Sequence, residues 1–191
     1  MLPASQVTLG ILAGGRATRL GGRDKAWLTR GGVPQVLRIA RRFGAECSSV
    51  CVSANRDPDA YAAHGLNAVS DRHPDIGPMG GIDALLVACR TPWLLTLPVD
   101  LVDANDCLLR TLATAGSDGA VAEDDDGLQP LVALYRVDVL RDPLQQAITA
   151  HQYSVQVLQT QLGLPVVRFN GFRFGNLNTP EDLRLAGYAD D

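Results

Sequence analysis

The sequence predicts an α/β protein with an open, mostly parallel, twisted sheet and helices on both faces. Over the first half of the chain, apolar strand-like runs alternate with helical runs, which is typical of such a sheet. The run 92–97 is apolar on both faces, as expected of a central strand covered by helices. Residues 120–122 and 131–135 instead indicate a β-pair joined by a turn, so the sheet should be mixed. These patterns and the length of 191 residues predict a single Rossmann-like domain.

The individual elements follow from short apolar runs bounded by glycine, proline and polar residues. Strands are expected at 7–12, 49–53, 67–69, 92–97, 120–122, 131–135 and 164–168. Helices are expected at 34–44, 59–64, 82–89, 108–113, 138–150, 154–162 and from 180 onward. Pro34 suits the first turn of its helix, and residues 30–32 form a turn before it. Ser154 and Thr179 are suitable N-caps, and Asp182 offers Thr179 a weak capping-box partner.

The stretch Leu12–Lys25 carries the strongest functional signal in the sequence. Four glycines fall within nine residues directly after the first expected strand, and cations lie among them: Arg16, Arg19, Arg23 and Lys25. Glycines let backbone amides approach a ligand closely, and consecutive amides form a concavity that binds anions. The cations would neutralise a polyphosphate. The loop is therefore expected to bind a nucleoside triphosphate.

The spacing of this loop excludes two common nucleotide-binding motifs. No register of the glycines gives G-x-G-x-x-G, and Gly21 is followed by Gly22 where a Walker A loop needs Lys. The pattern L-A-G-G-x-x-x-R-[LM]-G-x-x-x-K fits instead. It resembles the signature loop of nucleotidyltransferases, in which Arg and Lys stabilise charge on the α-phosphate and the departing pyrophosphate.

Polar residues follow the expected strand ends, where ligands bind in open α/β sheets. Asp100 could hold Mg²⁺ through its carboxylate or merely cap the next turn. Asp71 could accept hydrogen bonds from a base or hold a loop. The amides of Asn55, Asn176 and Asn178 suit ribose and phosphate groups, and the last two would share a face if extended.

Composition narrows the functional classes. The net charge of −4 favours neither nucleic acid nor an anionic membrane, and no apolar run approaches the length of a membrane span. With no signal peptide apparent, we expect a cytoplasmic protein. The four cysteines are expected to be small buried residues, and the acidic run 123–126 a solvated turn. No nucleophile arrangement is visible, which fits direct in-line transfer.

The whole set of motifs resembles the molybdenum cofactor guanylyltransferase family, MobA, over nearly the full chain. Seven segments carry the resemblance: 12–25, 52–56, Asp71, 77–81, 97–100, 129–134 and 176–183. The resemblance implies a single domain of the nucleotidyltransferase type that transfers GMP from GTP to the terminal phosphate of molybdopterin, with Mg²⁺. Residues 1–100 would form the nucleotide-binding half and residues 101–191 the acceptor side. Transient contact with other proteins of the cofactor pathway is also implied.

The resemblance also implies roles for individual residues. Backbone contacts to guanine and ribose come from Leu12, Ala13 and Gly14. Phosphates are bound by Gly15, Arg19, Gly22 and Lys25. Asp71 contacts the nucleotide, and Asp100 binds both Mg²⁺ and nucleotide. The pterin or its phosphate faces Gly80, Gly81, Asn176 and Asn178. Ser53 stands where relatives often have Asn, and its hydroxyl can still bond the nucleotide, beside Asn55.

Two other classes of function stay open at this point. A cytidylyltransferase acting on the same pterin, or a nucleotidyltransferase acting on a sugar or polyol phosphate, would use the same loop. Cytidylyl relatives tend to read L-A-A-G where this chain reads L-A-G-G, which favours guanine. A non-catalytic nucleotide-binding protein could keep the fold, but Arg19, Lys25 and Asp100 are all present.

Overall fold

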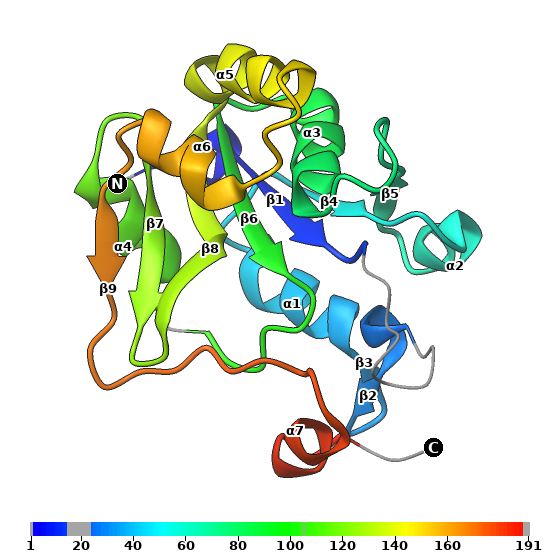
Figure 1. Cartoon of the computed structure of the whole chain (residues 1–191). Helices are drawn as coiled ribbons and strands as arrows, with labels where there is room; N and C mark the ends of the chain where they lie inside the picture. Colours follow the sequence, from blue (N-terminus) through cyan, green and yellow to red (C-terminus); the bar gives the residue numbers. More distant parts are fainter. Residues whose placement is uncertain (1, 15–23, 105, 189–191) are drawn as a thin grey trace.

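The computed structural model describes residues 2–14, 24–104 and 106–188, and an open seven-stranded sheet lies at its centre (Figure 1). From edge to edge the strands are β5 (Asn67–Val69), β4 (Ser49–Ser53), β1 (Val7–Leu12), β6 (Trp93–Pro98), β8 (Gly127–Arg136), β7 (Gly119–Asp124) and β9 (Val166–Arg168). β8 is antiparallel to both of its neighbours, and every other neighbouring pair is parallel. The mixed, mostly parallel sheet is confirmed, with the expected central strand in the middle position.

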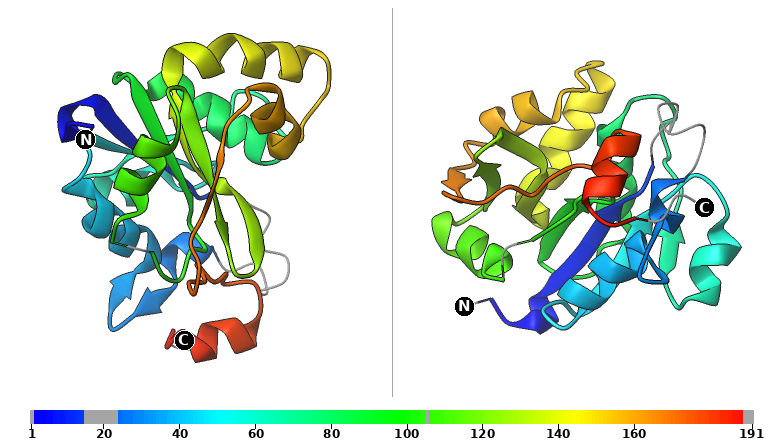
Figure 2. Two further views of the ribbon diagram at one scale, coloured as in Figure 1. Left: turned by 90° about the vertical axis from the view of Figure 1, so that its left-hand side faces the viewer. Right: turned by 90° about the horizontal axis from the view of Figure 1, so that it is seen from below.

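Helices cover both faces of the sheet, as predicted (Figure 2). One face packs against α1 (Gln35–Gly44) and α4 (Leu108–Ala115), and the other against α3 (Pro78–Ala88), α5 (Val137–Thr149) and α6 (Val155–Gln161). Successive strand residues point to opposite faces: Leu94 joins the core under α3 and α5, whereas Leu95 joins the core under α1 and α4. Among the described residues, no helix combines the length and the apolar character needed to cross a lipid bilayer.

The remaining elements are short. α2 (Pro58–Ala63) precedes β5, and β2 (Thr29–Arg30) pairs with β3 (Val33–Pro34) around the predicted turn. α7 (Pro180–Leu185) begins with the expected capping box, in which Thr179 and Asp182 bond each other's backbone. Leu28, just before β2, packs against Leu183 of α7.

Three local predictions are wrong. Pro34 lies in β3 and precedes α1, instead of occupying the first turn of the helix. The cause is the β-hairpin before it, whose turn residues Gly31 and Gly32 have positive φ (60° and 74°). α3 begins at Pro78 instead of residue 82, since Gly77 turns the chain at φ 65° and proline suits a first helical position. Gly80 and Gly81 are therefore helical. Finally, Cys107 is exposed, whereas the other cysteines are buried.

The acidic run 123–126 matches the predicted solvated turn only in part: Asp125 and Asp126 form an exposed turn between β7 and β8, whereas Asp124 is buried. Asp124 is only 1% exposed. Its carboxylate accepts hydrogen bonds from the backbone N–H of Phe174 (2.8 Å) and Asp126 (3.0 Å) and from Gln129 Nε2 (3.0 Å). Burial by itself raises the pKa of Asp124, but these hydrogen bonds outweigh it and hold the pKa below its ordinary value.

Asp124 thereby fastens residues 169–178, which we call the strap, to the hairpin of β7 and β8. The strap leads from β9 past the lower ends of β7 and β8 to α7 (Figure 1). Asp125 adds a second attachment, because its N–H donates to Phe172 O (3.0 Å). At the far end, Leu177 N–H donates to Asp100 O (3.1 Å). The strap thus joins the hairpin to the end of β6.

Replacing Asp124 with Asn should destabilise the fold by about 1–3 kcal/mol, because an amide group cannot accept from all three donors and leaves one unsatisfied. Urea unfolding followed by circular dichroism measures this change. Asp126→Asn is the matched control in the same turn; its ion pair with Arg173 is exposed, so the change should stay within about 0.5 kcal/mol. Equal unfolding midpoints for the two variants would contradict the anchoring role of Asp124.

The lowered pKa of Asp124 also sets the sign of a pH effect. A carboxylate whose pKa is lower in the folded state stabilises the fold fully above its unfolded value of about 3.9, and this contribution is lost as the pH falls through the folded value. Between about pH 5 and about pH 3, wild-type protein should therefore lose more stability than Asp124→Asn. Unfolding midpoints measured across this range test the difference.

Candidate functional site

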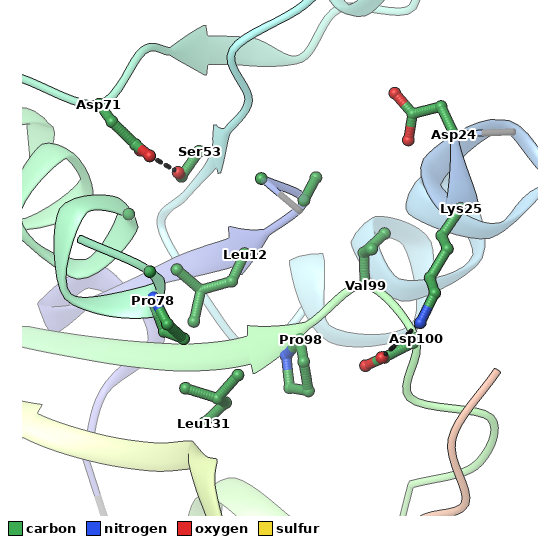
Figure 3. A pocket seen from close by; sticks show the side chains of 14 residues that line it. Leu12, Asp24, Lys25, Ser53, Asp71, Pro78, Pro98, Val99, Asp100 and Leu131 are labelled. Atoms are coloured by element: carbon green, nitrogen blue, oxygen red, sulfur yellow. Dashed lines mark hydrogen bonds and ion pairs between the residues drawn. The ribbon is translucent and has the colours of Figure 1, made fainter. Parts of the chain in front are cut away.

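A pocket with an empty volume of about 690 Å³ lies at the carboxyl ends of β1, β4 and β6 (Figure 3). The chain places β4 on one side of β1 and β6 on the other, so the strand order reverses here, which is where α/β sheets bind ligands. The lining residues are Leu12, Ala13, Gly14, Asp24, Lys25, Ser53, Asp71, Gly77, Pro78, Gly81, Pro98, Val99, Asp100 and Leu131. The predicted groups from three separate strand ends therefore meet in one cavity.

One side of the pocket carries a hydrogen-bonded cluster of Ser53, Asn55 and Asp71. Ser53 Oγ donates to Asp71 Oδ1 (3.0 Å), and Asn55 Nδ2 donates to Asp71 Oδ2 (2.9 Å). The Asp71 N–H in turn donates to Asn55 Oδ1 (2.8 Å). Both carboxylate oxygens of Asp71 are thus engaged by β4 and the residues after it, which fixes the direction of the carboxylate. Figure 3 shows Asp71 and Ser53 facing each other.

Gly80 and Gly81 let α3 pack unusually close to this cluster. A Cβ atom at Gly81 would lie 2.8 Å from Ser53 Oγ and 2.8 Å from Leu12 Cδ2, closer than real Cβ contacts. One at Gly80 would lie 2.9 Å from the carbonyl oxygen of His73. The two glycines were expected in a loop that a ligand approaches. Because they lie in α3, they instead allow Ser53, Leu12 and His73 to come close to the helix.

The opposite side of the pocket joins Lys25, Asp100 and Asn178. Lys25 Nζ donates to Asp100 Oδ2 (3.0 Å) and to Asn178 Oδ1 (2.8 Å). The side chains of Lys25 and Asp100 are 21% and 23% exposed, so the ion pair faces the pocket without being buried. Lys25 follows the glycine-rich loop, Asp100 follows β6, and Asn178 ends the strap. Figure 3 shows Lys25 and Asp100 pointing toward each other.

Local structure holds Lys25 and Asn178 in place. Lys25 begins a 3-10 helix, Lys25–Trp27, whose first turn is capped by Asp24 Oδ1 accepting from Ala26 N–H (2.9 Å). The Trp27 ring packs against the buried Tyr61, with centroids 4.9 Å apart. The N–H of Asn178 donates to Asp182 Oδ2 (3.1 Å) of the capping box. Lys25 and its partner Asn178 are therefore both attached to formed secondary structure.

The hydrogen bonds of the capping box also lower the pKa of Asp182. Hydrogen bonding with Thr179 is the largest cause, and the backbone of Asn178 and the charge of Lys25 act in the same direction against partial burial. The carboxylate is consequently held ionised next to the residue that meets Lys25. A helix N-terminus favours such a negative charge.

Other sequence-predicted residues stand apart from the pocket or outside the described chain. Gly15, Arg19 and Gly22 lie outside the described residues. Asn176 is exposed and pairs with Leu101 through a β-bridge, whereas Asn178 reaches Lys25. Sequence reasoning named neither Asp24 nor Leu131 as a lining residue, although they lie in the motif segments 12–25 and 129–134. It also missed a buried carboxylate behind the pocket, Asp83, which interrupts an apolar helical run.

The donor set at Asp100 suits a metal that is shared with a substrate. Within the described part of the chain, no group of three or more His, Cys, Asp or Glu side chains is placed to hold a metal ion. Mg²⁺ is commonly held by one or two carboxylates together with phosphate oxygens and waters. Asp100, partly exposed in the pocket, meets that requirement only in combination with a bound phosphate.

Comparisons with known proteins agree with this arrangement. Residues 9–164 match the family model of the MobA-like NTP transferase domain. The chain is 35% identical to the molybdenum cofactor guanylyltransferase of Vibrio campbellii, with all of both chains covered. It is 38% identical to the protein of that name from Cereibacter sphaeroides, covering 92% of this chain and 93% of that one.

A solved structure shares the fold. Molybdopterin-guanine dinucleotide biosynthesis protein A from Archaeoglobus fulgidus superposes with a TM-score of 0.70 at 22% identity, covering 94% of this chain and 96% of that one. The nucleotidyltransferase type of the sheet is therefore confirmed, and the resemblance drawn from the motifs is confirmed by the family match. The protein is an enzyme, and its chain belongs to the MobA-like NTP transferase family.

Proposed function

We propose that the protein transfers GMP from GTP to the terminal phosphate of molybdopterin, releasing pyrophosphate. The observation that carries this proposal is the meeting of Lys25, Asp100 and Asn178 at one side of the pocket, opposite Ser53 and Asp71. The ammonium group of Lys25 beside Asp100 suits a reacting phosphate. On the opposite side, the amide of Asn55 and the fixed carboxylate of Asp71 suit a nucleoside. Full-length similarity to enzymes named molybdenum cofactor guanylyltransferase supports guanine and the pterin acceptor.

The nucleoside would lie between the end of β1 and the Ser53–Asn55–Asp71 cluster. Leu12, Ala13 and Gly14 line this side and would offer their backbone to the base and ribose. Asp71, already oriented by Ser53 and Asn55, would accept hydrogen bonds without first being ordered. Preorganisation of this kind lowers the entropic cost of binding.

Lys25 is placed to stabilise the transferring phosphate. Its ammonium group has three donors, and two of them are used by Asp100 and Asn178. The third can be donated to an oxygen of the α-phosphate. As an oxygen of the acceptor phosphate forms a bond to the α-phosphorus, the bond to pyrophosphate breaks. Negative charge grows on the oxygens that Lys25 faces, so its field stabilises the transition state.

Asp100 would hold Mg²⁺ together with the nucleotide phosphates. When bound there, the metal offsets negative charge on the phosphate oxygens. Arg19, Gly15 and Gly22, assigned to the phosphates by their place in the motif, belong to the same proposed site. Lys25 and Asp100 keep each other's charge compensated before substrate enters. The ion pair therefore maintains the site in the absence of ligand.

The acceptor side is proposed to be formed by the second half of the chain, residues 101–191. Asn178 is the acceptor-binding residue best supported by its position, since it contacts Lys25 directly. Asn176 would join it from the same strap. Gly80 and Gly81 would complete this side through α3: Gly81 lines the pocket, and both glycines let the helix pack closely on Ser53 and Asp71. The protein would act in the cytoplasm, receive molybdopterin from other proteins of its pathway, and need neither nucleic acid nor a membrane.

Equilibrium titration of the four nucleoside triphosphates with Mg²⁺, at one salt concentration, tests the nucleotide. We expect GTP to bind at least about tenfold more tightly than the others, a difference of about 1.4 kcal/mol. A preference for CTP would replace the proposal with a cytidylyltransferase of the same mechanism. Folded protein that binds none of the four would contradict the proposal.

Removing the charged pair should abolish most turnover while the fold survives. Lys25→Gln and Asp100→Asn should each lower kcat by about 10²- to 10³-fold, because each removes charge stabilisation from the transition state. The assay is release of pyrophosphate with molybdopterin as acceptor. Asp103→Asn is the control, since this exposed carboxylate lies three residues beyond Asp100 and only caps Ala104 N–H (2.8 Å). Near-normal turnover and unchanged Mg²⁺ dependence in Asp100→Asn would refute the metal assignment.

A further inference from the structure

An ion pair between a fully buried carboxylate, Asp83, and a half-exposed arginine, Arg72, lies beside Asp71 at the nucleotide side of the pocket. Asp83, in the middle of α3, is 0% exposed. Its carboxylate accepts two hydrogen bonds from Arg72, with Nε–Oδ2 at 2.9 Å and Nη2–Oδ1 at 2.7 Å, and a third from Gln145 Nε2 of α5 at 2.5 Å. Burying a carboxylate costs several kcal/mol before its partners compensate. An apolar residue packed at the same position commonly stabilises a fold at least as much as a buried ion pair does. A reason beyond stability is therefore worth seeking.

The partner of Asp83 points to that reason. Arg72 follows Asp71 directly, and its side chain is 47% exposed, so the guanidinium is not itself part of the core. What the ion pair fixes is the backbone at residue 72, and hence the place of the neighbouring Asp71. His73 also lies next to the pair, with Nε2 4.0 Å from Asp83 Oδ2.

α3 also packs closely against residues 71–73 at a second position, Gly80. A Cβ atom at Gly80 would lie 2.9 Å from His73 O and 3.3 Å from Asp71 Cγ. Gly80 and Asp83 are three residues apart, so they share one face of the helix. Asp71 is thus held between two supports: Ser53 and Asn55 bond its carboxylate from the β4 side, and α3 packs against the same carboxylate and against the backbone of His73.

We propose that Asp83 is a positioning residue for the nucleotide site, acting through Arg72 to hold Asp71 in its binding orientation. This inference rests on the proposed function, in which Asp71 contacts the bound nucleotide. Asp83 itself does not line the pocket. Without its charge, the half-exposed Arg72 turns to solvent and the segment 71–73 loses its attachment to α3. Asp71 must then be ordered by the nucleotide, which weakens binding.

The test is a double-mutant cycle on GTP affinity, measured by isothermal titration calorimetry on the full chain. Asp83→Asn should weaken GTP binding about tenfold. In an Asp71→Ala background, the same substitution should change affinity by less than about twofold, because nothing remains for Asp83 to position. Asp138→Asn is the matched control: it also removes an Asp–Arg pair, with Arg136 at 2.9 and 3.0 Å, but an exposed one. Its affinity should equal wild type.

A conservative variant separates positioning from general stability. Arg72→Lys keeps the charge opposite Asp83 but cannot form the two parallel hydrogen bonds, so it should weaken GTP binding with little change in unfolding midpoint. It also serves if Asp83→Asn does not fold. Wild-type affinity in these variants, or equal losses with and without Asp71, would overturn the inference while leaving the proposed function intact. Wild-type protein that binds no GTP would overturn both.

Discussion

The parallel pairing of β1 with β4 and β6 is the constraint on which the rest of the site depends. In this register Leu12 stands opposite Ser53 on one side and opposite Pro98 on the other. The ladder continues one step beyond the strands, as Ala13 N–H bonds Ser53 O (2.9 Å) and Val99 N–H bonds Leu12 O (3.0 Å). Three chain segments therefore leave the sheet at the same level and can share one ligand. Helices cover both faces of the sheet beneath them, so the shared ligand site lies at the carboxyl ends of these strands.

Two kinds of support hold the functional side chains at this edge. The nucleotide side is built from polar groups that bond one another, with Asp71 at their centre and α3 behind it. The opposite side is built from distant parts of the chain, because Lys25 bonds residues 75 and 153 positions away. Asp124 supports the second side indirectly, since it fastens the strap that ends at Asn178. Buried carboxylates thus serve both sides from outside the pocket.

Local patterns predicted the fold well because the residues within most helices and strands are themselves typical of that element. The buried strand β6 and the capping box at Thr179 are examples, and both formed as expected. The start of α3 was misplaced because two glycines resemble a loop, and only packing against Ser53 and His73 explains them. Asp124 was misjudged for the opposite reason: its neighbours in the sequence are acidic, and its partner in the strap, Phe174, lies 50 residues later. The family resemblance brought Asn178 into the site, whereas its contact with Lys25 needed tertiary structure.

The position of the strap has a consequence for synthesis on the ribosome. All seven strands end by residue 168, so the complete sheet is encoded before the strap begins. Chains grow at about 5–20 residues per second, and N-terminal parts fold first. The sheet can therefore assemble while Lys25 still lacks Asn178, its partner from the strap. A nascent chain halted there would have the enzyme's architecture without the Lys25–Asn178 contact, so this side of the pocket is completed only after the strap has been synthesised.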